Sequence, residues 1–295
     1  MRPVGSKTRG AALILVLMVV GILGLLALQM GLNAKANVSR AERLQQRTEA
    51  MLRLQSNEAA LVFTLLTEPW VTGRERDTDN PYAKVWNFRG EPFEVDGIRY
   101  AIQDIKGLLS VPQAGDPIQT FQILLENLGV ERSRARRVIE RLSDAQGSSL
   151  QSNPQGDRRV PWQSLDEWRG LTELTDKELA RLDSLVSLYP NAEFNPATAP
   201  PAVLATKYDE GTLEPLLSLQ QRDEFDADRY RRLTGFGEDE FTVFYPGPGL
   251  RLSTSSFGDG FSLGRESTLI LRPYEFEPVQ MWGRKRLFNT ADLSP

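Results

Sequence analysis

The chain is 295 residues long and carries a formal net charge of −4, which argues against a nucleic-acid partner because such proteins present a basic face. It contains no cysteine and no histidine, so disulfides, thiolate metal sites and the common nucleophile–histidine pairs are excluded. Because the usual acid–base side chain is missing, we expect that the protein is not an enzyme.

The N-terminal segment is the most informative stretch of the sequence. Residues 11–30, AALILVLMVVGILGLLALQM, hold no charge, and Gln29 is the one polar side chain among them. As a helix, a segment of this length spans about 30 Å, the thickness of a bilayer core. Three basic residues precede it, namely Arg2, Lys7 and Arg9. They predict a cytoplasmic N-terminus and an exported remainder.

Three fates of this segment remain open from the residues alone. Ala34-Lys35-Ala36 fits signal-peptidase cleavage, but the apolar core is longer than the roughly 7–15 residues that such signals use. An uncleaved anchor would keep the whole segment. Cleavage between Gly10 and Ala11 would remove only the basic leader and retain the apolar helix.

The helix is expected to continue beyond the apolar segment. Residues 37–67 contain no proline or glycine, and their apolar side chains recur at steps of three and four residues, which predicts an amphipathic helix that packs on a domain. Glu68-Pro69 should end this helix. From Ala11 onward it would be roughly 80 Å long.

Two regions predict β-strands. Strands at 91–95 and 99–104 flank Asp96-Gly97, a turn signal, and form an expected hairpin. After Glu210 the strand pattern returns. It covers three stretches: 240–247, 249–257 and 267–288.

A helical unit lies between these regions. From Pro117 to Leu188 the apolar period is that of about four short helices. Two capping boxes mark helix starts: Ser164 with Glu167, and Thr175 with Glu178. One β-domain interrupted by an α-helical insertion is the economical arrangement of these elements.

The N-terminus resembles a type IV prepilin or pseudopilin signal, in which a short basic leader ends in glycine directly before an apolar helix. The resemblance implies that a prepilin peptidase cuts after Gly10 and that Ala11 becomes the methylated N-terminal residue. The family normally carries glutamate at the fifth mature position, where this chain has Leu15. The K-class minor pseudopilin of type II secretion lacks this glutamate, which suits a position at the fibre tip.

The order of elements is also similar to that class. AIQDIKGLLSVPQ (101–113) resembles the family's entry into its insertion, and Asn195–Pro200 resembles an Asn-x-Asn-Thr-Ala segment that follows the insertion helices. The resemblance implies an α+β fold, with a pilin-like long N-terminal helix and an antiparallel β-sheet domain interrupted by an α-helical insertion. The implied divisions are a leader (1–10), a transmembrane and stem helix (11–67), the β-domain (68–110 and 206–295) and the insertion (111–205).

The same resemblance implies a function and partners. The chain would be a tip subunit that supports pseudopilus assembly and protein export across the outer membrane. It would be a single-pass inner-membrane protein with a periplasmic C-terminal domain. Its partners would be the I- and J-class minor pseudopilins, the major pseudopilin, prepilin peptidase, the inner membrane and secreted substrates.

Calcium is the one cofactor for which the sequence offers candidates, because some members of the family bind it on a surface loop. The candidate ligands are Asp77, Asp79, Asp223, Asp226 and Asp228. Their spacing matches no known calcium loop, and calcium needs roughly six to eight oxygen ligands, so solvated acidic loops are the alternative.

Other functions also remain open. The chain could be an uncleaved single-pass periplasmic binding or scaffold protein, or a minor pilin of a related type IV pilus system. A hydrolase would need two carboxylates that face each other across a cleft. The adjacent acids Asp166-Glu167 and Glu238-Asp239-Glu240 do not predict such a pair.

Overall fold

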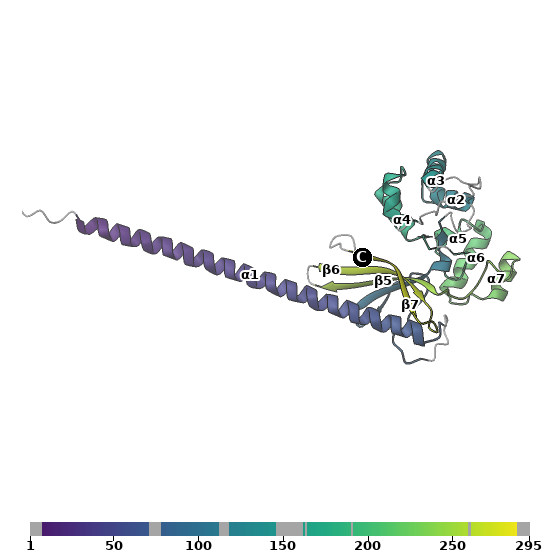
Figure 1. Ribbon diagram of the computed structural model, residues 1–295, viewed down its shortest axis with the longest axis horizontal. Helices are drawn as coiled ribbons and strands as arrows, with labels where there is room; N and C mark the ends of the chain where they lie inside the picture. The colour runs from purple at the N-terminus through teal and green to yellow at the C-terminus, as the bar shows by residue number, and fades with distance from the viewer. Residues whose placement is uncertain are drawn as a thin grey trace, which may run out of the picture. The chain divides into compact units, whose positions relative to one another are not determined.

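The computed structural model describes residues 8–70, 78–111, 118–145, 162, 164–189, 191–258 and 261–287 (Figure 1). The chain divides into two compact units, Met1–Gln55 and Ser56–Pro295. The second unit contains all of the strands and all helices after the first one among the described residues.

Helix α1 (Thr8–Thr67) confirms the long N-terminal helix and ends directly before Glu68-Pro69, as predicted. Its large apolar side chains are exposed from Leu13 to Leu52. Among the described residues, α1 is the one helix that is long and apolar enough to cross a membrane.

The last turns of α1 belong to the second unit and pack there. Leu61 and Leu65 on this part of the helix are buried. The indole Nε1 of Trp70 donates a hydrogen bond to the carbonyl of Leu65 at 2.6 Å, which satisfies one of the acceptors that a helix C-terminus leaves unpaired.

A five-stranded antiparallel sheet forms the centre of the second unit, in the order β1-β2-β5-β6-β7. The strands are β1 (Phe93–Val95), β2 (Ile98–Asp104), β5 (Gly249–Gly258), β6 (Phe261–Leu271) and β7 (Val279–Leu287). The predicted hairpin is confirmed by the pairing of β1 with β2. Its turn residues, Asp96 and Gly97, both have positive φ (53° and 73°), the backbone of a type I′ turn.

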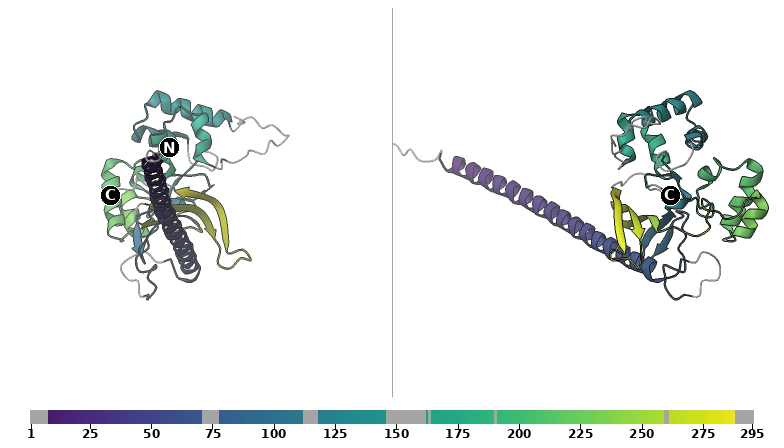
Figure 2. Two further views of the ribbon diagram at one scale, coloured as in Figure 1. Left: turned by 90° about the vertical axis from the view of Figure 1, so that its left-hand side faces the viewer. Right: turned by 45° about the vertical axis from the view of Figure 1, so that its right-hand side comes forward.

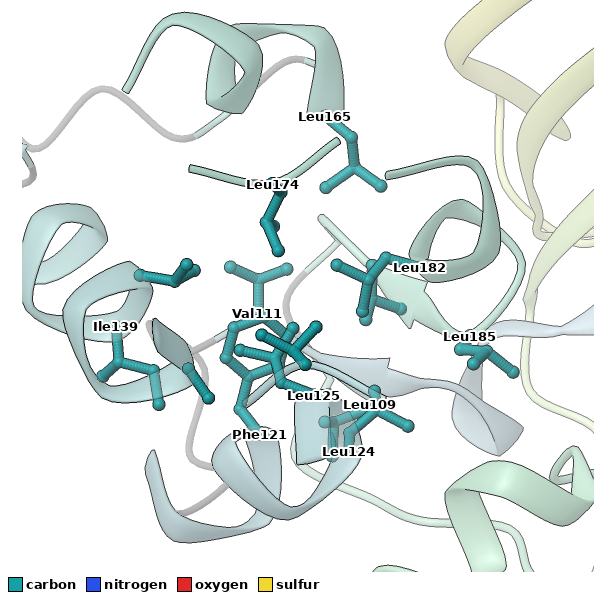
Figure 3. Close-up of a cluster of buried hydrophobic side chains, with 14 of the residues drawn as sticks. Leu109, Val111, Phe121, Leu124, Leu125, Ile139, Leu165, Leu174, Leu182 and Leu185 are labelled. Carbon is teal, nitrogen blue, oxygen red and sulfur yellow. The ribbon is translucent and has the colours of Figure 1, made fainter. Parts of the chain in front are cut away.

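The helical insertion follows β2 and has its own core (Figure 3). Its elements are η1 (Ile105–Gly107), β3 (Leu109–Ser110), α2 (Ile118–Asn127), α3 (Arg132–Ala145), η2 (Leu165–Gly170), α4 (Asp176–Asp183) and β4 (Val186–Ser187). The rings of Phe121 and Trp168 meet edge to face at 5.8 Å within this core. Both capping boxes are confirmed, although Ser164 starts a 3-10 helix and not an α-helix.

One expectation was wrong in part. The predicted strand stretches 249–257 and 267–288 are confirmed by β5, β6 and β7, but helices follow Glu210 first and 240–247 forms no strand. The chain forms α5 (Pro201–Leu204), α6 (Glu210–Gln221) and α7 (Ala227–Thr234), and the stretch 240–247 contributes only an isolated bridge between Thr242 and Phe194. Asp209 and Asp226 cap α6 and α7, and each accepts a hydrogen bond from the backbone N–H of the third residue of its helix. Figure 2 shows α6 and α7 as a group of helices separate from α2, α3 and α4.

Candidate functional site

The predicted processing junction lies within the first turns of α1, which begins at Thr8. Gly10 and Ala11 are therefore helical, and their side chains lie outside the description. Leu15, the position where the resembled family has glutamate, is 66% exposed. The apolar side chains around it are exposed on all sides of the helix, which is the pattern of a segment that needs an apolar environment, a membrane or a bundle of similar helices.

The end of α1 is fixed to the sheet by a desolvated ion pair. Arg265 of β6 places Nη1 2.5 Å from Oε2 of Glu58, and both side chains are largely buried. The hydroxyl of Ser267, also on β6, donates to Oε1 of Glu58 at 3.5 Å. The sequence contained a signal for this contact that we missed, since Glu58 is an acid within the apolar stripe that includes Leu61 and Leu65.

The junction between the sheet and the insertion is organised by one buried carboxylate, Asp104 at the end of β2. Its Oδ1 accepts from the backbone N–H of Lys106 at 3.0 Å and of Gly247 at 3.1 Å. Its Oδ2 accepts from Nδ2 of Asn195 and from the hydroxyl of Thr198, both at 2.9 Å. One side chain thus joins the strand that enters the insertion, the segment that leaves it and the segment before β5.

Close backbone packing accompanies this junction. A Cβ on Gly107 would lie 2.6 Å from the carbonyl oxygen of Thr198, so the position requires glycine. Lys106 forms an ion pair with Glu193 at 2.5 Å, and its backbone carbonyl accepts from the N–H of Asn195 at 2.9 Å. Both stretches resemble segments of the pseudopilin family, but no local sequence pattern predicts this role for their residues.

Burial raises the pKa of the Asp104 carboxyl to about 6, because loss of hydration disfavours the charged form. The four hydrogen bonds that it accepts act in the opposite direction and only partly offset this effect. Ionisation of Asp104 therefore lowers the stability of the folded state, and the hydrogen-bond donors around the carboxylate reduce this loss.

A cavity of about 280 Å³ separates the sheet from the insertion. Arg251 of β5 crosses this gap and donates to the carbonyls of Asp183 and Val186, the latter at 2.8 Å. Lys285 of β7 pairs with the carboxylate of Asp183 at 2.8 Å. Basic side chains of the sheet thus connect the sheet to the insertion across the cavity.

Four of the five predicted calcium ligands lie in the part of the chain that the structure describes, and each of these has another contact. Asp223 pairs with Arg89 at 2.6 Å, Asp226 caps α7, and Asp79 and Asp228 each lie 3.8 Å from a basic side chain. Asp77 lies outside the described residues. Within the part of the chain that the structure describes, no group of three acidic side chains could hold a metal ion. Calcium binding stays a prediction.

No protein-family model matches the chain, and no curated protein matches it. Among solved structures, it is similar to a chain of the GspK-GspI-GspJ complex from the type 2 secretion system of enterotoxigenic Escherichia coli. The TM-score is 0.52 at 15% sequence identity, over 85% of this chain and 100% of that chain. The fold is pseudopilin-like.

Proposed function

We propose that this chain is a minor pseudopilin of the K class, which enters the pseudopilus of a type II secretion system and supports protein export across the outer membrane. The observation that carries this proposal is the fold likeness to a chain of the GspK-GspI-GspJ complex over 85% of this chain. The apolar helix directly after Gly10 supports it independently.

The proposed mechanism is assembly. Prepilin peptidase removes the leader after Gly10, Ala11 is methylated, and the apolar part of α1 holds the chain in the inner membrane with the second unit in the periplasm. On extraction from the membrane, this part of α1 packs against the helices of neighbouring subunits. Burial of its exposed apolar side chains stabilises the fibre by about 25 cal/mol per Å².

Two features support the proposed position at the fibre tip. In the resembled family, the glutamate at the fifth mature position pairs with the N-terminal amine of a neighbouring subunit. This chain has Leu15 there, so it needs no neighbouring amine to pair with a buried carboxylate. The insertion adds a helical lobe with its own core to the pilin-like sheet, and a lobe of this kind restricts stacking. The I- and J-class minor pseudopilins, the major pseudopilin and secreted substrates are the proposed partners.

Deletion of the gene tests this function. We expect secreted proteins to accumulate in the periplasm, and we expect wild-type protein to restore their export. A variant in which a cleavable secretory signal precedes Ser56 should not restore it, because the second unit then lacks the stem. Normal secretion after deletion would contradict the proposal. Loss of surface pili with intact secretion would instead assign the chain to a type IV pilus system.

A further inference from the structure

The connection between β6 and β7 presents two aromatic side chains fully to solvent. Tyr274 is 102% exposed and Phe276 is 101% exposed, the highest values among the large hydrophobic side chains of the described residues. Folded proteins commonly expose single apolar side chains, but two fully exposed aromatic rings two residues apart in one turn are characteristic of interaction sites.

This turn, residues 272–278, is held in shape by its own contacts. The backbone N–H of Arg272 donates to the carbonyl of Pro278 at 2.8 Å, and the N–H of Glu275 donates to the carbonyl of Arg272 at 3.0 Å. The Arg272 guanidinium also pairs with the Glu275 carboxylate at 3.1 Å. Pro273 and Pro278 further restrict the backbone. Because the turn is pre-organised, little conformational entropy is lost when its aromatic rings bind.

Apolar exposure continues from this turn into β7, which is an edge strand of the sheet. Val279 and Met281 are 36% and 50% exposed. Natural proteins usually protect an edge strand with charged side chains; β7 carries its charges at 284–286, and its first part, residues 279–283, carries none. The turn and the start of β7 together form one surface, which we call the aromatic turn surface.

The charges of the turn indicate what this surface binds. Glu275 and Glu277 alternate with the two aromatic residues, so the turn carries more negative than positive charge. An anionic membrane surface would repel these carboxylates, whereas peripheral membrane segments carry lysine and arginine beside their aromatic residues. An apolar pocket with a basic rim on a protein complements the surface in both respects.

We infer that the aromatic turn surface docks into a basic-rimmed apolar pocket on a neighbouring minor pseudopilin. This inference rests on the proposed function, because the likeness to a chain from a three-subunit complex is what makes a neighbouring subunit the partner. Tyr274 and Phe276 are the anchors that enter the pocket, and Glu277 faces its rim, whereas Glu275 is paired with Arg272 within the turn.

The test compares variants of the full chain, in detergent, for binding to the purified I- and J-class minor pseudopilins of the same host. Tyr274→Ser combined with Phe276→Ser should weaken binding about tenfold or more, since aromatic anchors dominate interface energetics. Phe236→Ser is the matched control, because Phe236 is an exposed aromatic residue (70%) outside this surface, and binding should be unchanged. Glu277→Lys should weaken binding and also reduce its dependence on salt.

Photo-crosslinking provides the second readout, with benzoylphenylalanine in place of Phe276 in cells. A product with one of these two subunits supports the inference, and products with lipid alone overturn it. Equal binding by wild type and the double variant would overturn the inference and leave the proposed function standing. A wild-type chain that binds neither subunit would overturn both.

Discussion

Replacement of Asp104 by alanine is the most direct perturbation of the junction between the sheet and the insertion. Asp104→Ala removes the acceptor of four donors at one point. The hydroxyl of Thr198 can still donate to the carbonyl of Asn195, which is 3.3 Å away. The backbone N–H groups of Lys106 and Gly247 and the amide of Asn195 lose their acceptor in a buried site.

The expected loss of stability can be estimated from two opposing effects. Each buried donor without a partner costs about 1–3 kcal/mol. At pH 7 the variant also avoids the cost of ionising a buried carboxyl, which is about 3 kcal/mol for a pKa that rises from 3.8 to about 6. The net decrease in the free energy of unfolding should therefore be about 3 kcal/mol.

The pH dependence of this difference has a definite sign. Because the pKa of Asp104 is raised on folding, the proton binds the folded state more tightly, and wild type gains stability from this group as the pH falls from about 6 to about 4. The alanine variant lacks that gain. The stability difference between the two proteins should thus widen by about 1 kcal/mol between pH 7 and pH 5.

Denaturant unfolding followed by tryptophan fluorescence measures this difference, since all five tryptophans of the chain lie in the second unit. Asp104→Asn is the matched variant. It keeps the side-chain volume and one acceptor but places an amide against the donors of Asn195 and Thr198, so its loss should be smaller. That loss should widen with falling pH by the same amount, because asparagine, like alanine, does not titrate. A stability difference between wild type and Asp104→Ala that stays constant or narrows from pH 7 to pH 5 would refute the reasoning, because the raised pKa of Asp104 requires this difference to widen.

Three further predictions concern other positions. Glu58→Ala should lower the free energy of unfolding by about 3–5 kcal/mol in the same assay, because it leaves Arg265 buried without its carboxylate partner. A loss below about 1 kcal/mol would contradict the claim that this ion pair is desolvated. Gly107→Ala should destabilise the protein by more than about 2 kcal/mol, because the added Cβ would collide with the backbone of Thr198. Gly170→Ala is the control, since nothing lies within 4 Å of its added Cβ, and it should change stability by less than about 1 kcal/mol. Equal effects would be inconsistent with the close packing of Gly107 against Thr198. Gly10→Val should block removal of the leader, so the unprocessed chain accumulates in membranes on immunoblots, and normal processing would count against prepilin-type cleavage.

Much of the fold was predictable from local signals. The length of α1, its end before Glu68-Pro69, the β1–β2 hairpin and both capping boxes follow from periodicity, turn chemistry and helix capping, which act between residues near in sequence. The helices α6 and α7 were missed although Asp209, Asp226 and Gly235 are ordinary helix boundary residues.

The contacts that join the parts of the second unit could not be predicted in this way. Asp104 meets Asn195, Thr198 and Gly247 from far along the chain, and only the fold brings them together. Glu58 was visible as an acid in an apolar stripe, but nothing local identifies Arg265 as its partner. The aromatic turn at Tyr274 had been assigned to a strand stretch, so its exposure was not foreseen.

The measurement that tests the central claim most directly is the intact mass and N-terminal residue of the protein purified from membranes, with and without the host's prepilin peptidase. The account predicts a chain that begins at a methylated Ala11 only when the peptidase is present. An intact Met1 in both samples would contradict it and leave an uncleaved anchored protein. A start at Asn37 would equally contradict it, since the chain would then be a secreted protein without its stem.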